Sequence, residues 1–345
     1  MIPDQGGHVV KRATLSAVLA LTLLWSVAAG QTQNKYAAHI AALFERDSVT
    51  IVVTDSGLGG LSVCADLEAL FRESRAIRSV RLVFVNALPD LAYTYNAMRS
   101  VEEQARVFDD ALRGIVAASG PDAILIACNT LSAVYPKTTF SRNAAIPVVS
   151  IIDVGSRMIA DQAKRSGSSR IIILGTPSTI ASGSYQEQFA ALGIGQEKIV
   201  AQPCKLLESE IQADPNSDLV SSLIETYVDE AMEKIGPEST GRATVGLCCS
   251  HYGYSLDAFR LVLKQRLGEQ FEIVNPNNAM VALFAVAKEP MPGQATRTTV
   301  QVLSKVPFTE QEIQSIAGAV VGKSPRTAEA LKHYQQRDNL FPLRK

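Results

Sequence analysis

The chain has 345 residues, 47% of them hydrophobic, which is enough for two domains with sizeable cores. Its formal net charge of −1, with 19% charged residues, argues against nucleic acid or an acidic membrane surface as a partner. Five cysteines without regular spacing do not indicate a disulfide framework.

Residues 1–30 have the pattern of a secretory signal. Lys11 and Arg12 precede an apolar run from Ala13 to Ala29, and small residues lead up to Gly30. The alternative is a retained anchor, because the run with its flanks approaches membrane-spanning length. Thr and Ser within the run favour cleavage. We therefore expect an exported, periplasmic protein that has no membrane contact after cleavage.

After this segment, strand and helix patterns alternate along the chain. A short helix over 34–44 precedes a β-branched run at 49–54, which is typical of a strand buried on both faces. A turn follows at 55–60. Apolar spacing then predicts helices at 61–72, 102–119, 219–235 and 256–267, and strands at 80–86, 122–127, 147–152, 171–174, 243–247 and 271–274. This alternation predicts an α/β fold with two similar doubly wound domains, whose mostly parallel sheets face each other across a cleft.

We expect a discontinuous first domain over 48–145 and about 254–290, and a second domain over 146–253. Residues 291–345 form a C-terminal extension to which the sequence assigns no role, although 298–303 has a strand pattern and 310–320 a helix pattern.

Two predicted strands lead into cysteines. The strand at 122–127 leads into Cys128, and the strand at 243–247 leads into Cys248 and Cys249. Ligands of open α/β sheets bind at the carboxyl ends of strands. Two facing halves would therefore place the thiols of Cys128 and Cys249 across one cleft.

Each of these sites also allows a simpler interpretation. The glycine-rich turn at 55–60 fits a phosphate site poorly; it either brings Asp55 and backbone N–H groups to a cleft or is a tight turn with a helix cap. Cys128 is either a buried small side chain or a thiol whose pKa the following helix lowers. His251 allows three interpretations: a histidine buried in the core, a metal ligand, or the base of a cysteine. No third or fourth ligand is spaced along the sequence to complete a zinc site.

Four segments in order carry a resemblance: residues 55–62 (DSGLGGLS), 127–133 (ACNTLSA), 174–179 (LGTPST) and 249–252 (CSHY). Each is weak alone. Together they resemble glutamate racemase, of the aspartate/glutamate racemase superfamily, and the likeness runs from about Val49 to Val281. It implies racemisation of an amino acid by two cysteines, with no pyridoxal phosphate, other cofactor or metal.

The resemblance also implies roles for individual residues. Cys128 and Cys249 are the acid/base pair, with Asp55 assisting Cys128 and His251 assisting Cys249. The substrate binders that it implies are Asp55, Ser56, Tyr95, Asn96, Asn129, Thr130, Thr179, Ser250 and His251. The expected partner is a small amino acid, most simply glutamate converted for cell-wall synthesis. A homodimer is an option left open.

Several departures from the family pattern touch the substrate pocket. Ser250 stands where Thr is usual and Cys248 where Gly is usual, while Thr94 and Asn96 replace the Pro and Gly beside Tyr95. An exported location is also unusual for an enzyme that supplies cytoplasmic precursors. The alternatives are a racemase for another amino acid, a related isomerase or decarboxylase, and a periplasmic amino-acid binding protein.

Overall fold

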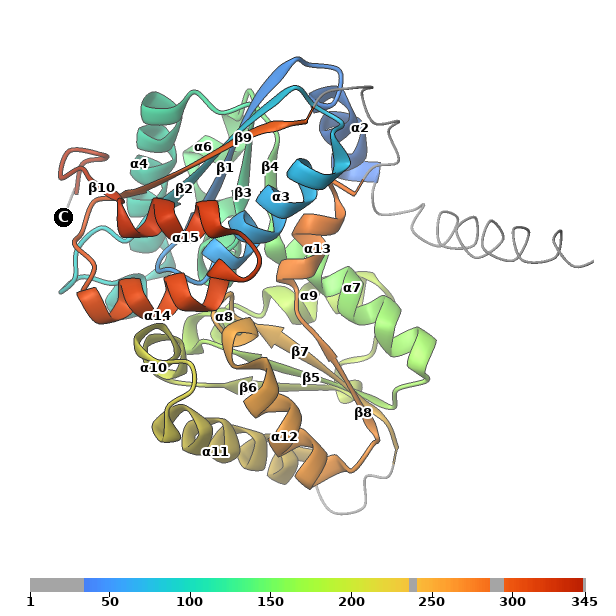
Figure 1. Cartoon of the computed structure of the whole chain (residues 1–345). Coiled ribbons are helices and arrows are strands. Elements are labelled where there is room, and N and C mark those ends of the chain that lie inside the picture. The colour runs from blue at the N-terminus through green and yellow to red at the C-terminus, as the bar shows by residue number, and fades with distance from the viewer. Residues whose placement is uncertain (1–33, 236–240, 286–294, 344–345) are drawn as a thin grey trace, which may run out of the picture.

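The computed structural model describes residues 34–235, 241–285 and 295–343. The predicted signal at 1–30 lies outside these ranges. Among the described helices, none combines the length and the apolar character needed to cross a membrane. Figure 1 shows two lobes, each built around its own sheet.

The first lobe holds a six-stranded parallel sheet in the order β10-β9-β2-β1-β3-β4. Its strands are β1 (Ser48–Asp55), β2 (Ser79–Asn86), β3 (Ala123–Ile126), β4 (Val148–Ser150), β9 (Arg297–Ser304) and β10 (Gln335–Gln336). Its helices are α2 (Asn34–Leu43), α3 (Leu61–Ser74), α4 (Val101–Ser119), α5 (Asn129–Val134), α6 (Thr139–Asn143), α14 (Glu310–Val321) and α15 (Pro325–Lys332), with 3-10 turns η1 (Tyr95–Ala97) and η2 (Tyr135–Lys137).

The second lobe holds a four-stranded parallel sheet in the order β6-β5-β7-β8. Its strands are β5 (Arg170–Gly175), β6 (Ile199–Pro203), β7 (Ala243–Cys248) and β8 (Phe271–Val274). Its helices are α8 (Pro177–Ala181), α9 (Ser184–Ala191), α10 (Leu207–Ala213), α11 (Asp218–Ile235) and α12 (Leu256–Leu267), with η3 (Gln196–Lys198) and η4 (Tyr252–Ser255). The predicted α/β class with two parallel sheets is confirmed.

Two helices join the lobes. α7 (Ile151–Ser166) packs against β4 of the first sheet and against β7 and β8 of the second, while α13 (Asn277–Ala282) packs against α7 and α3. One buried apolar cluster contains β1 residues such as Ile51, α7 residues such as Ile159 and β5 residues such as Ile173. Because this core is continuous, it fixes the sheets relative to each other and so positions the cleft.

Local sequence explains where the main helices begin and end. Ser100 caps α4 by accepting a hydrogen bond from the Glu103 N–H, and Gly120 ends that helix at φ 55°. The predicted strand at 147–152 is too long. β4 ends at Ser150, and α7 starts at Ile151. Ile151 and Ile152 are buried as the first residues of this helix, and an apolar pair gives the same sequence signal in a helix as in a strand.

The predicted domain boundaries need two corrections. Residues 256–274 do not return to the first domain, because α12 packs on α11 and β8 pairs in parallel with β7 of the second sheet. The segment 297–336, which was predicted to belong to a separate C-terminal extension, is part of the first lobe, because β9 pairs with β2 along its whole length. Glu68 of α3 is fully buried and accepts hydrogen bonds from Thr298, Ser324 and Arg326, which fastens this C-terminal segment to the first lobe.

Candidate active site

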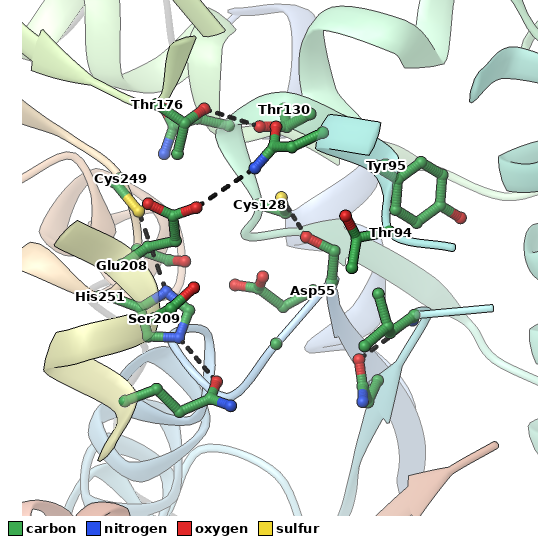
Figure 2. A pocket seen from close by; sticks show the side chains of 18 of the residues that line it. Asp55, Thr94, Tyr95, Cys128, Thr130, Thr176, Glu208, Ser209, Cys249 and His251 are labelled. Atoms are coloured by element: carbon green, nitrogen blue, oxygen red, sulfur yellow. Dashed lines mark hydrogen bonds between the residues drawn. The ribbon is translucent and has the colours of Figure 1, made fainter. Parts of the chain in front are cut away.

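A cavity of about 260 Å³ lies between the lobes and is lined by residues from both. It sits at the carboxyl ends of β1, β3 and β7, as expected for ligand sites in parallel sheets. Figure 2 shows Cys128, Cys249, Asp55 and Glu208 around this space. The two thiols that the sequence singled out therefore share one site.

Cys128 occupies the N-cap of α5. Its Sγ accepts a hydrogen bond from the Leu131 N–H at 3.5 Å and lies 3.3 Å from Ser56 Oγ. The helix position agrees with the sequence, but a lowered thiol pKa, one of the two interpretations that the sequence left open, is wrong. Burial, and then the nearby Asp55 carboxylate, raise the pKa of Cys128 to about 12.

Asp55 ends β1 and is 1% exposed. Burial raises its pKa from 3.8 to about 6, although the Ser250 hydroxyl and the Ser56 N–H act in the opposite direction. Its Oδ2 is buried without a hydrogen-bond partner. Asp55 is therefore mostly ionised at neutral pH, and it stands beside Cys128 as an accessible proton acceptor.

Cys249 follows β7, and a histidine ring lies beside its thiol. His251 Nδ1 lies 3.8 Å from Cys249 Sγ. Burial lowers the pKa of His251 to about 4, so the ring is neutral near pH 7. Burial also raises the pKa of Cys249, with the Glu208 carboxylate adding to this effect. In the described arrangement both cysteines are therefore thiols, each beside one group that can accept a proton.

The glycine-rich turn lets the lobes approach closely. A Cβ at Gly59 would lie 2.3 Å from Ser250 Oγ and 2.8 Å from the His251 backbone nitrogen, so no side chain fits there. The Tyr254 hydroxyl also donates to the carbonyl oxygens of Leu58 and Gly59. Close approach of backbone, rather than phosphate binding, accounts for these glycines.

The remaining predicted binders line the same cavity, with different orientations. The Asn129 Oδ1 accepts from Tyr185, and its Nδ2 is buried without a partner. The Thr130 hydroxyl contacts Thr179 Oγ1 at 3.2 Å. The Tyr95 hydroxyl instead donates to the Ala87 carbonyl, so it does not point at a ligand. The residues of the predicted set that line the cavity are Asp55, Ser56, Tyr95, Asn96, Asn129, Thr130, Thr179, Ser250 and His251.

Among the cavity residues that sequence reasoning missed, the polar side chains that matter most here are Thr176, Glu208, Gln212 and Glu312. Thr176 lies within the segment 174–179 that carries the resemblance, although it was not predicted to bind substrate. Its hydroxyl lies 3.0 Å from Thr130 Oγ1. Glu208 and Gln212 lie on α10, a short helix after an unpredicted strand, and carry no motif. Glu312 belongs to the segment that was left without a role.

The described residues contain no group of three or more His, Cys, Asp and Glu side chains arranged to hold a metal ion. The cavity lining includes three carboxylates and no Lys or Arg: Asp55, Glu208 and Glu312. Hydrogen bonding to hydroxyls, amides and backbone N–H groups is therefore what the described site offers to a ligand anion.

Comparison with known proteins decides the family. The model of the Asp/Glu/hydantoin racemases matches residues 51–239, more than half of the chain. The chain belongs to this family. It is therefore an amino-acid racemase, and Asp55 and Cys128 lie within the matched segment.

Individual relatives agree with this assignment. Glutamate racemase from Desulforudis audaxviator is 24% identical over 283 residues, covering 80% of this racemase and 95% of that protein. Glutamate racemase from Aquifex pyrophilus is 28% identical over 231 residues, covering 67% and 80%. The solved glutamate racemase from Francisella tularensis in complex with D-glutamate superposes with a TM-score of 0.59 at 18% identity, covering 80% and 94%. At that identity, the solved structure shows a shared fold.

Proposed function

We propose that this racemase interconverts L- and D-glutamate, with Cys128 and Cys249 as its acid/base pair. One observation carries the proposal: two thiols from different lobes line one cavity, and each has a separate proton acceptor beside it. Racemisation needs a base on one face of the α-carbon and an acid on the other. Two opposed thiols meet this need.

The proposed reaction consists of three proton transfers. In the L-to-D direction, His251 takes the Cys249 proton, and the thiolate then removes the α-proton of L-glutamate. The C–H electron pair is delocalised into the α-carboxylate. The Cys128 thiol donates its proton to the opposite face, which completes the new C–H bond and leaves a thiolate near Asp55. When the product leaves, His251 releases its proton to solvent and the Cys128 thiolate takes one from solvent, which restores two thiols. The reverse reaction exchanges these roles.

The empty site resists thiolate formation, because burial and carboxylates raise the pKa of both cysteines. A bound substrate changes this balance. Its ammonium group brings a positive charge beside Asp55 and Glu208, which favours a nearby thiolate. The site is thus arranged so that a reactive thiolate forms mainly when substrate is present.

Glutamate is the substrate named for the curated relatives. The unpartnered Asn129 Nδ2 is a donor suited to a ligand carboxylate, and the hydroxyls of Thr130, Thr176 and Thr179, which contact one another, line the same cavity. These groups recognise carboxylates without a cation, which fits the lining of this cavity.

The test is incubation of the protein with L-glutamate in D2O, followed by proton NMR and chiral chromatography. We expect loss of the α-proton signal and appearance of D-glutamate up to an equal mixture, and slower exchange of L-aspartate and L-glutamine. Cys204→Ala is the matched control, because the Cys204 thiol is buried against the Gln202 carbonyl and does not line the cavity. Net consumption of substrate, or tight binding without exchange, would contradict the proposal.

We also propose that residues 1–30 direct export. The support is the sequence pattern of Lys11 and Arg12, the apolar run and the small residues that follow. Expression of the full chain, cell fractionation and N-terminal sequencing test it. A periplasmic product that begins near Gln31 is expected. A cytoplasmic protein that retains Met1 would refute export and leave the proposed chemistry untouched.

A further inference from the structure

The Gln212 side chain lies where the turn after β1, the second lobe and the C-terminal segment meet. Its Oε1 accepts a hydrogen bond from the Leu58 N–H at 2.7 Å and lies 3.0 Å from His251 Nε2. Its Nε2 donates to Glu312 of α14. A single amide therefore contacts the base of one cysteine and a carboxylate outside the matched family segment.

Two of these partners fix the orientation of the amide. A backbone N–H can only donate, so the atom facing Leu58 must be the oxygen. A carboxylate can only accept, so the atom facing Glu312 must be the nitrogen. Glu312 is itself held in place, because its Oε2 accepts from the Thr309 N–H at 2.8 Å in the capping box of α14.

The fixed amide in turn determines the state of His251. Because Gln212 Oε1 is an acceptor, the His251 Nε2 that faces it must carry a hydrogen. In a neutral ring the other nitrogen, Nδ1, then has a free lone pair, and that nitrogen faces Cys249 Sγ. An amide also differs from a carboxylate in that it does not favour a charged ring.

We propose that Gln212, held by Glu312, is a positioning residue that keeps His251 neutral and protonated on Nε2, so that Nδ1 can accept the Cys249 proton. The inference rests on the proposed pairing of His251 with Cys249. It gives the C-terminal segment a part in the reaction through Glu312, which touches no reacting atom.

The charged and titratable groups around His251 come from several elements. They are Cys249, Tyr254, Asp55, Glu208 and, through Gln212, Glu312. A carboxylate near the ring favours the protonated form of His251. Burial disfavours that charged form, and the pKa of His251 is lowered. The group in direct contact with Nε2 is the neutral amide, which is the contact that a substitution can change.

The sharpest test exchanges the acid and the amide. The double variant Gln212→Glu with Glu312→Gln keeps an acid–amide pair and the net charge, but it places a carboxylate against His251 Nε2. NMR of 15N-histidine-labelled protein reports the protonated nitrogen and the pKa of His251. His251→Gln serves only to assign its signal among the four histidines.

We expect Nε2–H in both the parent and the exchange variant, and a rise in the His251 pKa of at least about one unit in the variant, because an opposite charge now touches the ring. The acid limb of the kcat profile for L-glutamate, the direction in which His251 is the base, should move up with it. Gln212→Leu, which lacks the acceptor, should lower kcat about tenfold or more with little change in KM. At alkaline pH the kcat of the exchange variant should be much closer to that of the parent than the kcat of Gln212→Leu is.

An Nδ1–H ring in the parent, an unmoved His251 pKa in the exchange variant, or parental kcat in Gln212→Leu would each overturn the inference. Because the NMR measurement needs no substrate, it separates the two proposals. If the spectra are as expected but the protein does not racemise glutamate, the proposed substrate is wrong and the positioning of His251 by Gln212 is still supported.

Discussion

Replacing Asp55 with Asn should destroy activity and at the same time stabilise the protein. Asp55 is 1% exposed, and burial raises its pKa from 3.8 to about 6. Each unit corresponds to about 1.4 kcal/mol, so burying the ionised form costs up to about 3 kcal/mol at pH 7. Asn removes that cost but places a buried NH2 group where Oδ2 has no hydrogen-bond partner, a loss of about 1 kcal/mol. We expect a net gain of about 1–2 kcal/mol.

The sign of the pH dependence follows from the raised pKa. Between 3.8 and about 6 the folded protein binds more protons at Asp55 than the unfolded chain does, so this contribution to stability falls as pH rises through that window. The advantage of Asp55→Asn should be complete above about pH 6 and should vanish near pH 4. Parental activity on D-glutamate should fall as pH drops through about 6, because a protonated Asp55 cannot take the proton of Cys128.

Urea unfolding at pH 7.5 and pH 4.5, followed by circular dichroism, measures the difference in stability. Asp257→Asn is the matched control, because its side chain is 95% exposed and lies outside the cavity. Racemisation by Asp55→Asn should fall about 100-fold or more. A variant less stable than the parent at pH 7.5, or one with the same stability difference at both pH values, would refute the reasoning about the buried charge.

Other predictions address the thiols, the fold and cofactors. Cys128→Ala and Cys249→Ala should each abolish racemisation. Residual α-proton exchange in D2O should favour the L-form in Cys128→Ala and the D-form in Cys249→Ala. The same preference in both variants would contradict the assignment of one thiol to each face of the substrate. Gly59→Ala should lower the unfolding free energy by about 1–3 kcal/mol in denaturant titration, because its Cβ would meet Ser250 and backbone; unchanged stability would mean that the turn relaxes freely. Glu68→Gln should cost about 1–3 kcal/mol in the same assay, since one oxygen cannot satisfy all of its buried donors; a neutral effect would show that the C-terminal segment docks without it. EDTA dialysis and hydroxylamine should leave racemisation unchanged, and loss under either treatment would contradict a reaction run by thiols alone.

The sequence by itself determined the class of the fold and predicted that Cys128 and Cys249 would share one site. The β-branched run before Asp55 and the apolar strands before Cys128 and Cys249 are local patterns, and parallel strands bring their carboxyl ends to one edge. Four ordered motifs then sufficed to indicate the family. This information lies within short windows, so it can be read without knowing which elements become neighbours.

Only the tertiary structure decided the features that depend on contacts between distant segments. Pairing of β8 with β7 and of β9 with β2 moved the predicted boundaries, because several apolar strands fit either sheet equally well on pattern alone. Burial reversed the expected shift in the pKa of Cys128, since desolvation outweighs the field of a short helix. Gln212 and Glu312 carry no local signal. They become part of the site only because α10 and α14 pack together, with Gln212 and Glu312 100 residues apart in the chain, and bring an amide and a carboxylate to His251.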